Sequence, residues 1–255
     1  MGKLDHKVAI VTGGGTGIGQ SIALEFAKEG ADVVVCSRNM ANLGKVVEEI
    51  KALGRRSLAI ATDVGVKEQV QNMVKQTVDK FSRVDILVNN AGVLRRGPLL
   101  EVTEQDWDEV MDTDLKGVFL CTQAVAKRMI EQKYGKIINI SSICGRGGAL
   151  PRLSSYSAAK AGVIQLTKSA ALELSPYGIN INAIAPGAVI TPITYFQRTP
   201  EQVEQFMEDS KKLSVLGRLG DTQDIANLAL FLASDDSSFI CGETIAIDGG
   251  RKDRM

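Results

Sequence analysis

The 255-residue sequence lacks the charge imbalance and the long apolar runs that mark nucleic-acid-binding and membrane-spanning proteins. Its 30 lysines and arginines balance 30 aspartates and glutamates, so no net positive field favours nucleic acid. No stretch reaches the roughly eighteen consecutive apolar residues of a transmembrane helix, and residues 1–7 have mixed charges that are untypical of a signal peptide. We therefore expect a soluble, cytoplasmic protein with no membrane partner and no nucleic-acid partner.

Cysteine and histidine are also scarce. The four cysteines, Cys36, Cys121, Cys144 and Cys241, are far apart and form no CxxC pair, so neither a zinc cage nor a disulfide framework is expected. The single histidine, His6, precedes the first apolar run and is not expected to bind a ligand. We predict no metal site and interpret the cysteines as small buried residues, with redox sensitivity of Cys144 as the alternative.

Short β-branched runs alternate with longer amphipathic segments along the whole chain. The apolar runs are 8–11, 33–35, 58–60, 86–88, 137–140, 179–181 and 244–247, and the helical patterns are 20–28, 40–53, 67–80, 104–132, 155–175 and 222–233. This alternation predicts an α/β fold with a parallel sheet covered by helices on both faces. No linker or repeat divides the chain, so residues 1–255 are predicted to form a single domain.

One polar stretch, residues 190–219, departs from this rhythm and contains Pro192 and Pro200. It follows the sixth predicted strand, and ligands of open α/β sheets bind beyond the carboxyl ends of the strands. The stretch is therefore a candidate substrate lid, with a plain surface loop as the alternative.

A glycine-rich run, Thr12-Gly13-Gly14-Gly15-Thr16-Gly17-Ile18-Gly19, joins the first strand to the first helix. Backbone amides at a helix N-terminus can face a phosphate, so the run predicts a dinucleotide site. A turn rich in glycine for packing reasons alone is the alternative.

Further along, Tyr156 and Lys160 are four residues apart on one predicted helix face, and Ser142 precedes them. A phenol, an ammonium and a hydroxyl together are typical of a proton-transfer site. A half-buried helix tyrosine and a surface lysine are the alternative interpretation.

In sequence order, the chain contains seven short motifs: Thr12-Gly13-x-x-x-Gly17-x-Gly19, Asp63-Val64, Asn89-Asn90-Ala91-Gly92, Ser142, Tyr156-x-x-x-Lys160, Pro186-Gly187 with Thr191, and Asp248-Gly249-Gly250. From about Lys7 to Gly250 it resembles the short-chain dehydrogenase/reductase family. The resemblance implies a Rossmann-like, doubly wound sheet of seven parallel strands, commonly assembled into homotetramers. It also implies hydride transfer between a nicotinamide cofactor and a secondary alcohol or ketone.

The resemblance further implies the roles of individual residues. Ser142, Tyr156, Lys160 and Asp114 would be catalytic, with Ser142 holding the substrate oxygen. Asp63 would contact the adenine, Asn90 and Gly92 the ribose, and Val189 and Thr191 the carboxamide. The cofactor-binding residues would be Gly13, Gly15, Thr16, Gly17, Ile18, Gly19, Ser37, Arg38, Asp63, Val64, Asn90, Ala91, Gly92, Tyr156, Lys160, Pro186, Gly187, Val189 and Thr191.

Hydride transfer requires a proton to move the opposite way, through a group whose pKa lies near the working pH. A free tyrosine has a pKa of about 10, and the gap of roughly three units from neutrality corresponds to about 4 kcal/mol. We expect Lys160, together with an oxidised nicotinamide, to lower the pKa of Tyr156.

The end of the second strand bears on cofactor choice. An acidic residue there usually accepts the ribose 2′-hydroxyl of NAD, whereas this chain has Ser37 and Arg38 and no carboxylate. Both side chains can donate to a 2′-phosphate, so we predict NADP, with NAD as the alternative.

Two positions depart from the family pattern. Asp114 stands where the family usually has an asparagine, which helps to hold a water relay behind the lysine. If the relay uses the main-chain carbonyl, the substitution is tolerable. If it needs the amide donor, proton delivery suffers, because an ionised carboxylate cannot donate. Ser142 precedes Tyr156 by 14 residues, one more than usual, and an insertion within 145–155 would absorb the difference. Ser141 is the less favoured alternative to Ser142.

Four arginines, Arg95, Arg96, Arg146 and Arg152, follow strands near this region and are candidates to bind an anionic hydroxy or oxo acid. The segment 92–96 resembles sugar-acid members such as gluconate and 2-deoxygluconate dehydrogenases. Solvated arginines or subunit contacts are the alternative. A 3-oxoacyl thioester or small-ketone reductase and a catalytically impaired dinucleotide-binding regulator are the other functions considered.

Overall fold

The protein folds around one parallel sheet. A computed structural model describes residues 2–147 and 150–254 and shows seven strands in the order β3-β2-β1-β4-β5-β6-β7. The strands are β1 Val8–Thr12, β2 Asp32–Ser37, β3 Ser57–Ala61, β4 Ile86–Asn89, β5 Gly135–Ile140, β6 Ile179–Pro186 and β7 Thr244–Ile247. The predicted α/β, doubly wound, seven-stranded fold is confirmed.

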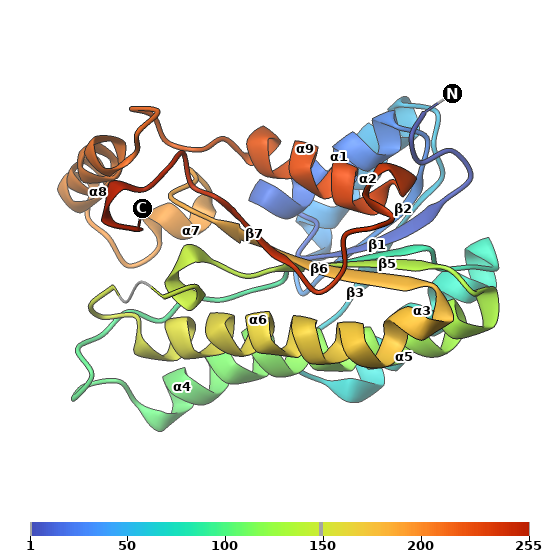
Figure 1. The fold of residues 1–255 in the computed structure, drawn as a ribbon, viewed down its shortest axis with the longest axis horizontal. Helices are drawn as coiled ribbons and strands as arrows, with labels where there is room; N and C mark the ends of the chain where they lie inside the picture. The colour runs from blue at the N-terminus through green and yellow to red at the C-terminus, as the bar shows by residue number, and fades with distance from the viewer. Residues whose placement is uncertain (1, 148–149, 255) are drawn as a thin grey trace.

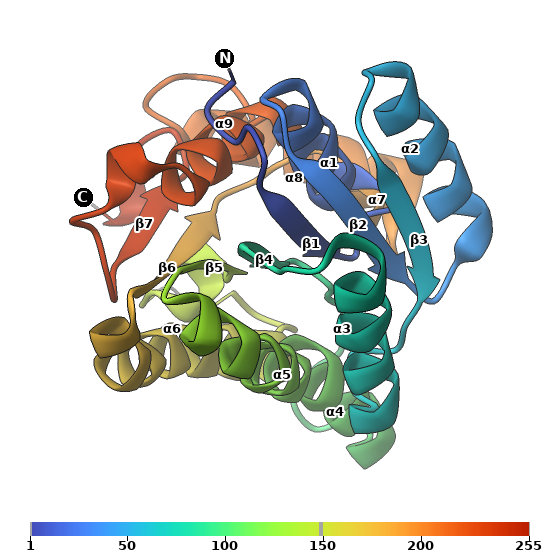
Figure 2. The same ribbon diagram turned by 90° about the vertical axis from the view of Figure 1, so that its right-hand side faces the viewer.

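Helices cover both faces of this sheet (Figures 1 and 2). They are α1 Gly17–Lys28, α2 Met40–Ala52, α3 Lys67–Phe81, α4 Glu104–Met111, α5 Gly117–Gln132, α6 Ser154–Leu174, α7 Pro192–Tyr195, α8 Pro200–Leu213 and α9 Thr222–Ala233. One apolar core joins α1, α2 and α9 to the sheet, and a second joins it to α3 and α5. All five residues of β1 are buried, because a strand covered on both faces needs apolar side chains on both.

The strand order reverses beside β1, which pairs with β2 on one side and with β4 on the other. Connections leave β1 and β4 in opposite directions, so a crevice opens between their carboxyl ends, where ligands bind in open α/β sheets. The predicted glycine run follows β1, and Asn90 follows β4. The topology therefore brings these two motifs to the same edge of the sheet.

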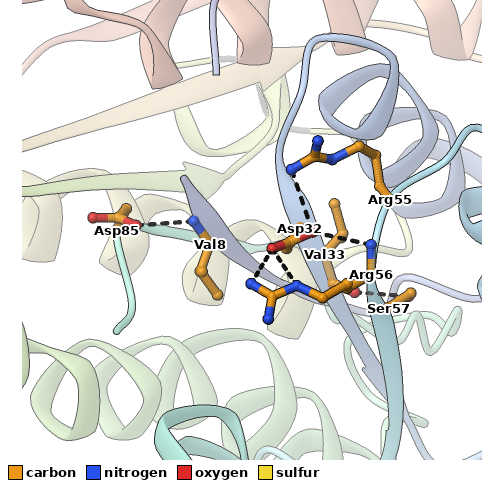
Figure 3. A network of polar contacts seen from close by, with 7 residues as sticks. All are labelled: Val8, Asp32, Val33, Arg55, Arg56, Ser57 and Asp85. Carbon is orange, nitrogen blue, oxygen red and sulfur yellow. Dashed lines mark hydrogen bonds and ion pairs between the residues drawn. The ribbon is translucent and has the colours of Figure 1, made fainter. Parts of the chain in front are cut away.

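Two buried aspartates fix the opposite, amino-terminal edge (Figure 3). Asp85 Oδ2 accepts the Val8 N–H at 2.9 Å at the start of β1, and its Oδ1 lies 2.6 Å from Arg83 Nη2. Asp32 accepts bonds from the Arg56 N–H at 3.0 Å and from its guanidinium at 2.6 Å. These carboxylates satisfy backbone donors at strand ends that would otherwise be buried without a partner.

The predicted helix 104–132 is not continuous. A π-helical turn, Asp112–Lys116, separates α4 from α5, because one extra residue is accommodated there. The apolar pattern alone does not reveal such an insertion. The turn directs Asp114 into the interior, where its side chain is fully buried.

The candidate lid segment, residues 190–219, contains two helices, α7 and α8, that the sequence analysis did not identify. Thr199 begins α8 with a capping box: its hydroxyl accepts the Gln202 N–H, and the Gln202 side chain accepts the Thr199 N–H. Both helices lie beyond the carboxyl end of β6, at the edge of the sheet where the glycine run lies (Figure 1). Across residues 2–147 and 150–254, no helix has the length and apolar character needed to cross a bilayer.

Candidate active site

A cavity of about 520 Å³ opens at the carboxyl edge of the sheet, where the glycine run, the ends of β4, β5 and β6, and the start of α6 meet. A second cavity of about 230 Å³ adjoins it and shares Gly13, Thr16, Arg38, Ala91 and Gly92 with it. Together they are lined by every predicted cofactor residue except Gly19. Residues from five separate parts of the chain therefore converge on one elongated site.

The glycine run makes a tight turn that side chains would block. Gly13 has φ +63°, and a Cβ there would lie 2.8 Å from Asn90 Nδ2. A Cβ at Gly19 would collide with the Gly13 carbonyl, which explains why Gly19 is needed although it lines neither cavity. The Gly13 and Gly14 N–H groups donate to Cys36 O, and the turn leads into α1, so the amides that can face a phosphate are those that follow, from Gly15 into the first turn of the helix. This cradle fits the pyrophosphate of a dinucleotide.

Asn90, which is predicted to contact the ribose, lines the larger cavity and also links two strand ends. Its amide donates to Thr12 O at 3.0 Å and to Gly13 O at 3.2 Å, which ties the end of β4 to the glycine turn. The Thr12 hydroxyl, which sequence reasoning missed, accepts the N–H groups of Asn90 and Ala91 at 2.9 and 3.0 Å. These bonds set the width of the crevice between β1 and β4.

Tyr156 and Lys160 lie on the first turns of α6, with the Lys160 ammonium 5.5 Å from the centroid of the Tyr156 ring. Lys160 donates to Ile140 O at 3.0 Å and is buried. The Ser141 hydroxyl donates to Lys160 O at 2.8 Å, whereas the Ser142 hydroxyl accepts the Cys144 N–H and keeps its own proton available. The structure therefore favours Ser142 over Ser141 beside the phenol.

Part of the loop that carries the predicted one-residue insertion, 145–155, lies outside the described residues at 148–149. Its described remainder brings Ser142 and Tyr156 to the same cavity despite the longer spacing.

The pKa of Tyr156 is raised in the chain without a cofactor, opposite to the expected net direction. Burial is the main cause; Lys160 lowers the pKa as predicted, but Asp114 raises it. The Ser142 hydroxyl, like Lys160, lowers the pKa of Tyr156. At neutral pH the phenol is therefore protonated and can act as a proton donor.

Asp114 is held between two partners. Its Oδ1 accepts the Val93 N–H at 2.7 Å, and its Oδ2 lies 3.0 Å from Lys160 Nζ. Burial raises the pKa of Asp114, although Lys160 and the Val93 N–H oppose it. Burial would lower the pKa of Lys160, but the charges of Asp114 and Tyr156 raise it. The carboxylate thus acts on the lysine directly, as a buried ion pair.

At the end of β2, Ser37 and Arg38 line the smaller cavity. Arg38 is exposed, and its Nη1 lies 3.9 Å from Glu109 Oε1, too far for a strong hydrogen bond. Its guanidinium is therefore available to a phosphate at the ribose end of the site.

The four predicted substrate arginines do not all line one cavity. Arg95 lines the larger cavity, but Asp106 and Glu109 neutralise it, at 3.4 Å and 2.5 Å. Neither cavity, as lined by described residues, includes Arg96, Arg146 or Arg152. The positions of the four arginines in the sequence predicted that they lie near the site. They could not reveal that two acidic residues of α4 pair with Arg95.

The segment after β6 supplies lining residues that the sequence prediction named only as a lid. Pro192, Ile193 and Phe196 border the larger cavity, and the last two are exposed. The apolar residues within an otherwise polar stretch were the available signal.

Comparisons with known proteins agree with this geometry. The family model described as Enoyl-(Acyl carrier protein) reductase matches residues 13–252. The chain is 44% identical over 248 residues, 97% of each chain, to the (2S)-[(R)-hydroxy(phenyl)methyl]succinyl-CoA dehydrogenase subunit BbsD of Thauera aromatica. It is 45% identical over 246 residues, 96% of this chain and 98% of the other, to the 3-oxoacyl-[acyl-carrier-protein] reductase FabG of Staphylococcus epidermidis.

Solved structures are similar as well. A short-chain type dehydrogenase/reductase from Mycobacterium marinum has a TM-score of 0.91 and 35% identity, covering 98% of this chain and 96% of the other. A structure assigned as a gluconate dehydrogenase from Agrobacterium tumefaciens has a TM-score of 0.90 and 33% identity, covering 96% of both chains. The sugar-acid resemblance is thus supported only by a structural neighbour, and the more similar relatives are named for thioesters.

Proposed function

Because the chain belongs to the short-chain dehydrogenase/reductase family, we propose that it reduces the 3-oxo group of an acyl thioester with NADPH. At the level of the family, it is an NAD(P)-dependent oxidoreductase acting on CH–OH groups. The observation that carries the finer proposal is that two relatives at 44% and 45% identity, over nearly the whole chain, are both named for acyl thioesters. The substrate named for the BbsD relative also carries a free carboxylate.

The preference for NADPH is supported by the end of β2. Ser37 and Arg38 line the cavity there, and no carboxylate follows the strand to accept a ribose 2′-hydroxyl. When bound, the nicotinamide supplies the hydride. The glycine turn would hold its pyrophosphate, and Val189 and Thr191, which line the larger cavity, would hold its carboxamide.

The chain's own residues supply the proton and the orientation. Burial keeps the pKa of Tyr156 high, so the phenol is protonated at neutral pH. It donates this proton to the carbonyl oxygen as the alkoxide forms. The Ser142 hydroxyl donates a hydrogen bond to the same oxygen and fixes its position. The Lys160 ammonium stabilises the phenolate that remains.

Two further features support a lid and an oligomer. Ile193 and Phe196 lie on the cavity border and are exposed, as expected of residues that close over a substrate. Phe119, Leu172 and Phe239 are 45%, 82% and 103% exposed, which favours burial against other copies in a homotetramer. Residues 1–255 would then form a single domain with a substrate lid at about 190–219.

The alternatives have weaker support. A sugar-acid dehydrogenase is favoured only by the gluconate dehydrogenase neighbour at 33% identity. A dinucleotide-binding regulator would not need Tyr156, Lys160 and Ser142 to face one cavity, as they do here.

The proposal is tested by following NADPH absorbance with 3-oxohexanoyl-CoA, and NADP⁺ reduction with the 3-hydroxy product, beside gluconate and 5-oxogluconate. We expect turnover of the thioesters in both directions and a kcat/KM at least about tenfold above that of the sugar acids. Turnover of the sugar acids alone would transfer the assignment to them, and no turnover of any substrate would favour the regulator.

A further inference from the structure

Three arginines from separate segments come together next to the cavity. Arg96 follows β4, Arg152 precedes α6, and Arg198 lies between α7 and α8. The Gly97 N–H donates to Arg152 O at 3.2 Å, and the Arg96 N–H donates to Gln197 Oε1 at 2.9 Å. These bonds hold the three segments against each other at the positions of the arginines.

No acidic side chain neutralises this group. Within residues 2–147 and 150–254, no ion pair involves Arg96, Arg152 or Arg198, whereas the adjacent Arg95 has two. Arg96 is half-buried, and its Nε is shielded from solvent without a hydrogen-bond partner. Arg198 uses one nitrogen on Thr194 O and lies over the Phe206 ring at 3.9 Å. A partly buried cation without an acidic partner is costly unless an anion neutralises it.

The arginine charges act on one another, and the reacting phenol acts on Arg96. Burial lowers the pKa of Arg96, and Arg152 lowers it further. Burial and the charge of Arg96 lower the pKa of Arg198 to about 10. The Tyr156 phenol has the opposite effect and raises the pKa of Arg96. Guanidinium groups stay charged in proteins, so the group remains cationic at neutral pH and repels itself.

We propose that Arg96, supported by Arg198 and Arg152, binds a carboxylate on the acyl part of the substrate, a short distance from the 3-oxo group. Arginine's planar fork pairs with a carboxylate through two parallel hydrogen bonds, and among the described residues the hydrogen bond of Arg96 comes from its backbone N–H, not from its guanidinium. This inference rests on the proposed thioester reduction and adds a substrate class to it.

A phosphate of the thioester carrier is the other source of an oxyanion. The pantetheine arm separates that phosphate from the reacting carbonyl, whereas Arg95, the residue before Arg96, lines the same cavity as Tyr156. A carboxylate on the acyl chain is therefore the better match for Arg96.

Four substrates separate these sources: 3-oxohexanoate and 3-oxoadipate, each as the N-acetylcysteamine thioester and as the CoA thioester. The two acyl groups differ in that 3-oxoadipoyl ends in a carboxylate where 3-oxohexanoyl ends in a methyl group. The two carriers differ in that CoA carries phosphates and N-acetylcysteamine does not. We expect wild-type kcat/KM to be at least about tenfold higher for 3-oxoadipoyl on both carriers, as one charge-assisted contact provides. A preference for both CoA thioesters regardless of the acyl group would assign the arginines to the carrier phosphate and overturn the proposal.

Arg96→Gln and Arg198→Gln should lower kcat/KM for the 3-oxoadipoyl thioesters at least about tenfold and leave the 3-oxohexanoyl thioesters within about twofold. Lys45→Gln is the charge control, because it also removes one positive charge, from an exposed position of α2 that lines neither cavity of the site. An equal fall in kcat/KM for both acyl groups would show that the arginines stabilise the structure and do not bind the carboxylate.

A binding measurement is independent of turnover. In the presence of NADP⁺, adipate should raise the Tm of the wild type, adipamide should not, and Arg96→Gln should abolish the difference. If no thioester is reduced but adipate still binds through Arg96, the proposed function fails and the carboxylate site stands. If adipate does not bind the wild type, the carboxylate site is wrong whatever the turnover.

Discussion

Lys160 Nζ lies 3.0 Å from Asp114 Oδ2, and both side chains are buried. The carboxylate occupies a position where the family usually has an asparagine, which is uncharged. Because the pair is shielded from water, its charges act strongly on each other and on Tyr156. Asp114 therefore sets the proton affinity of the site in a way that an asparagine would not.

Asp114→Asn should move the pH dependence of reduction to lower pH. Burial raises the pKa of Tyr156, and Asp114 raises it further, so removing the charge lowers the pKa. Reduction needs the protonated phenol, so the rate falls as pH rises through this pKa, and that fall should begin at lower pH in the variant. The measurement is the pH profile of kcat/KM for NADPH-dependent reduction.

Asp112→Asn is the matched control, since Asp112 lies in the same π-helical turn but pairs with Lys116 on the surface at 3.0 Å. Its profile should coincide with the wild type. An unchanged profile for Asp114→Asn, or a shift to higher pH, would contradict the role given to Asp114.

Arg38→Asp should erase or invert the preference for NADPH. We expect the wild type to have a kcat/KM for NADPH at least about tenfold above that for NADH, because a charge-assisted bond to the 2′-phosphate contributes that much. Lys45→Asp makes the same charge change on an exposed position of α2 and should keep the preference. A wild type that prefers NADH would refute the assignment.

Asp85→Ala should destabilise the fold by about 2–4 kcal/mol, since it leaves the Val8 N–H and Arg83 without their acceptor. The contact lies at the amino edge of the sheet (Figure 3), whereas the cavity opens at the carboxyl edge. Urea unfolding gives the free energy of unfolding. Asp236→Ala removes an exposed ion pair with Lys3 and should leave the free energy of unfolding close to that of the wild type. An equal loss in the two variants would show that burial of Asp85 is not the cause.

The sequence predicted the sheet because its strands are covered on both faces and therefore consist of apolar runs, as in the fully buried β1. The glycine turn after β1 was predictable because positions such as Gly13 have no room for a side chain. Both signals are local and need no knowledge of distant contacts.

The remaining features depend on contacts between distant segments. The π-helical turn at Asp112–Lys116 follows a periodic apolar pattern that a single extra residue barely disturbs. The neutralisation of Arg95 depends on where α4 places Glu109, and the raised pKa of Tyr156 depends on its burial. The helix α8 was missed although Thr199 and Gln202 form a recognisable capping box.

The most direct test compares wild type with Tyr156→Phe in NADPH-dependent reduction of a 3-oxoacyl thioester. The variant keeps the ring and its packing and loses only the hydroxyl, so kcat should fall at least about a hundredfold while the Kd for NADPH stays within about twofold. Tyr177→Phe, at an exposed position beyond the end of α6, should retain full activity. If Tyr156→Phe reduces the thioester at a rate near that of the wild type, Tyr156 is not the proton donor and the account of this site is wrong.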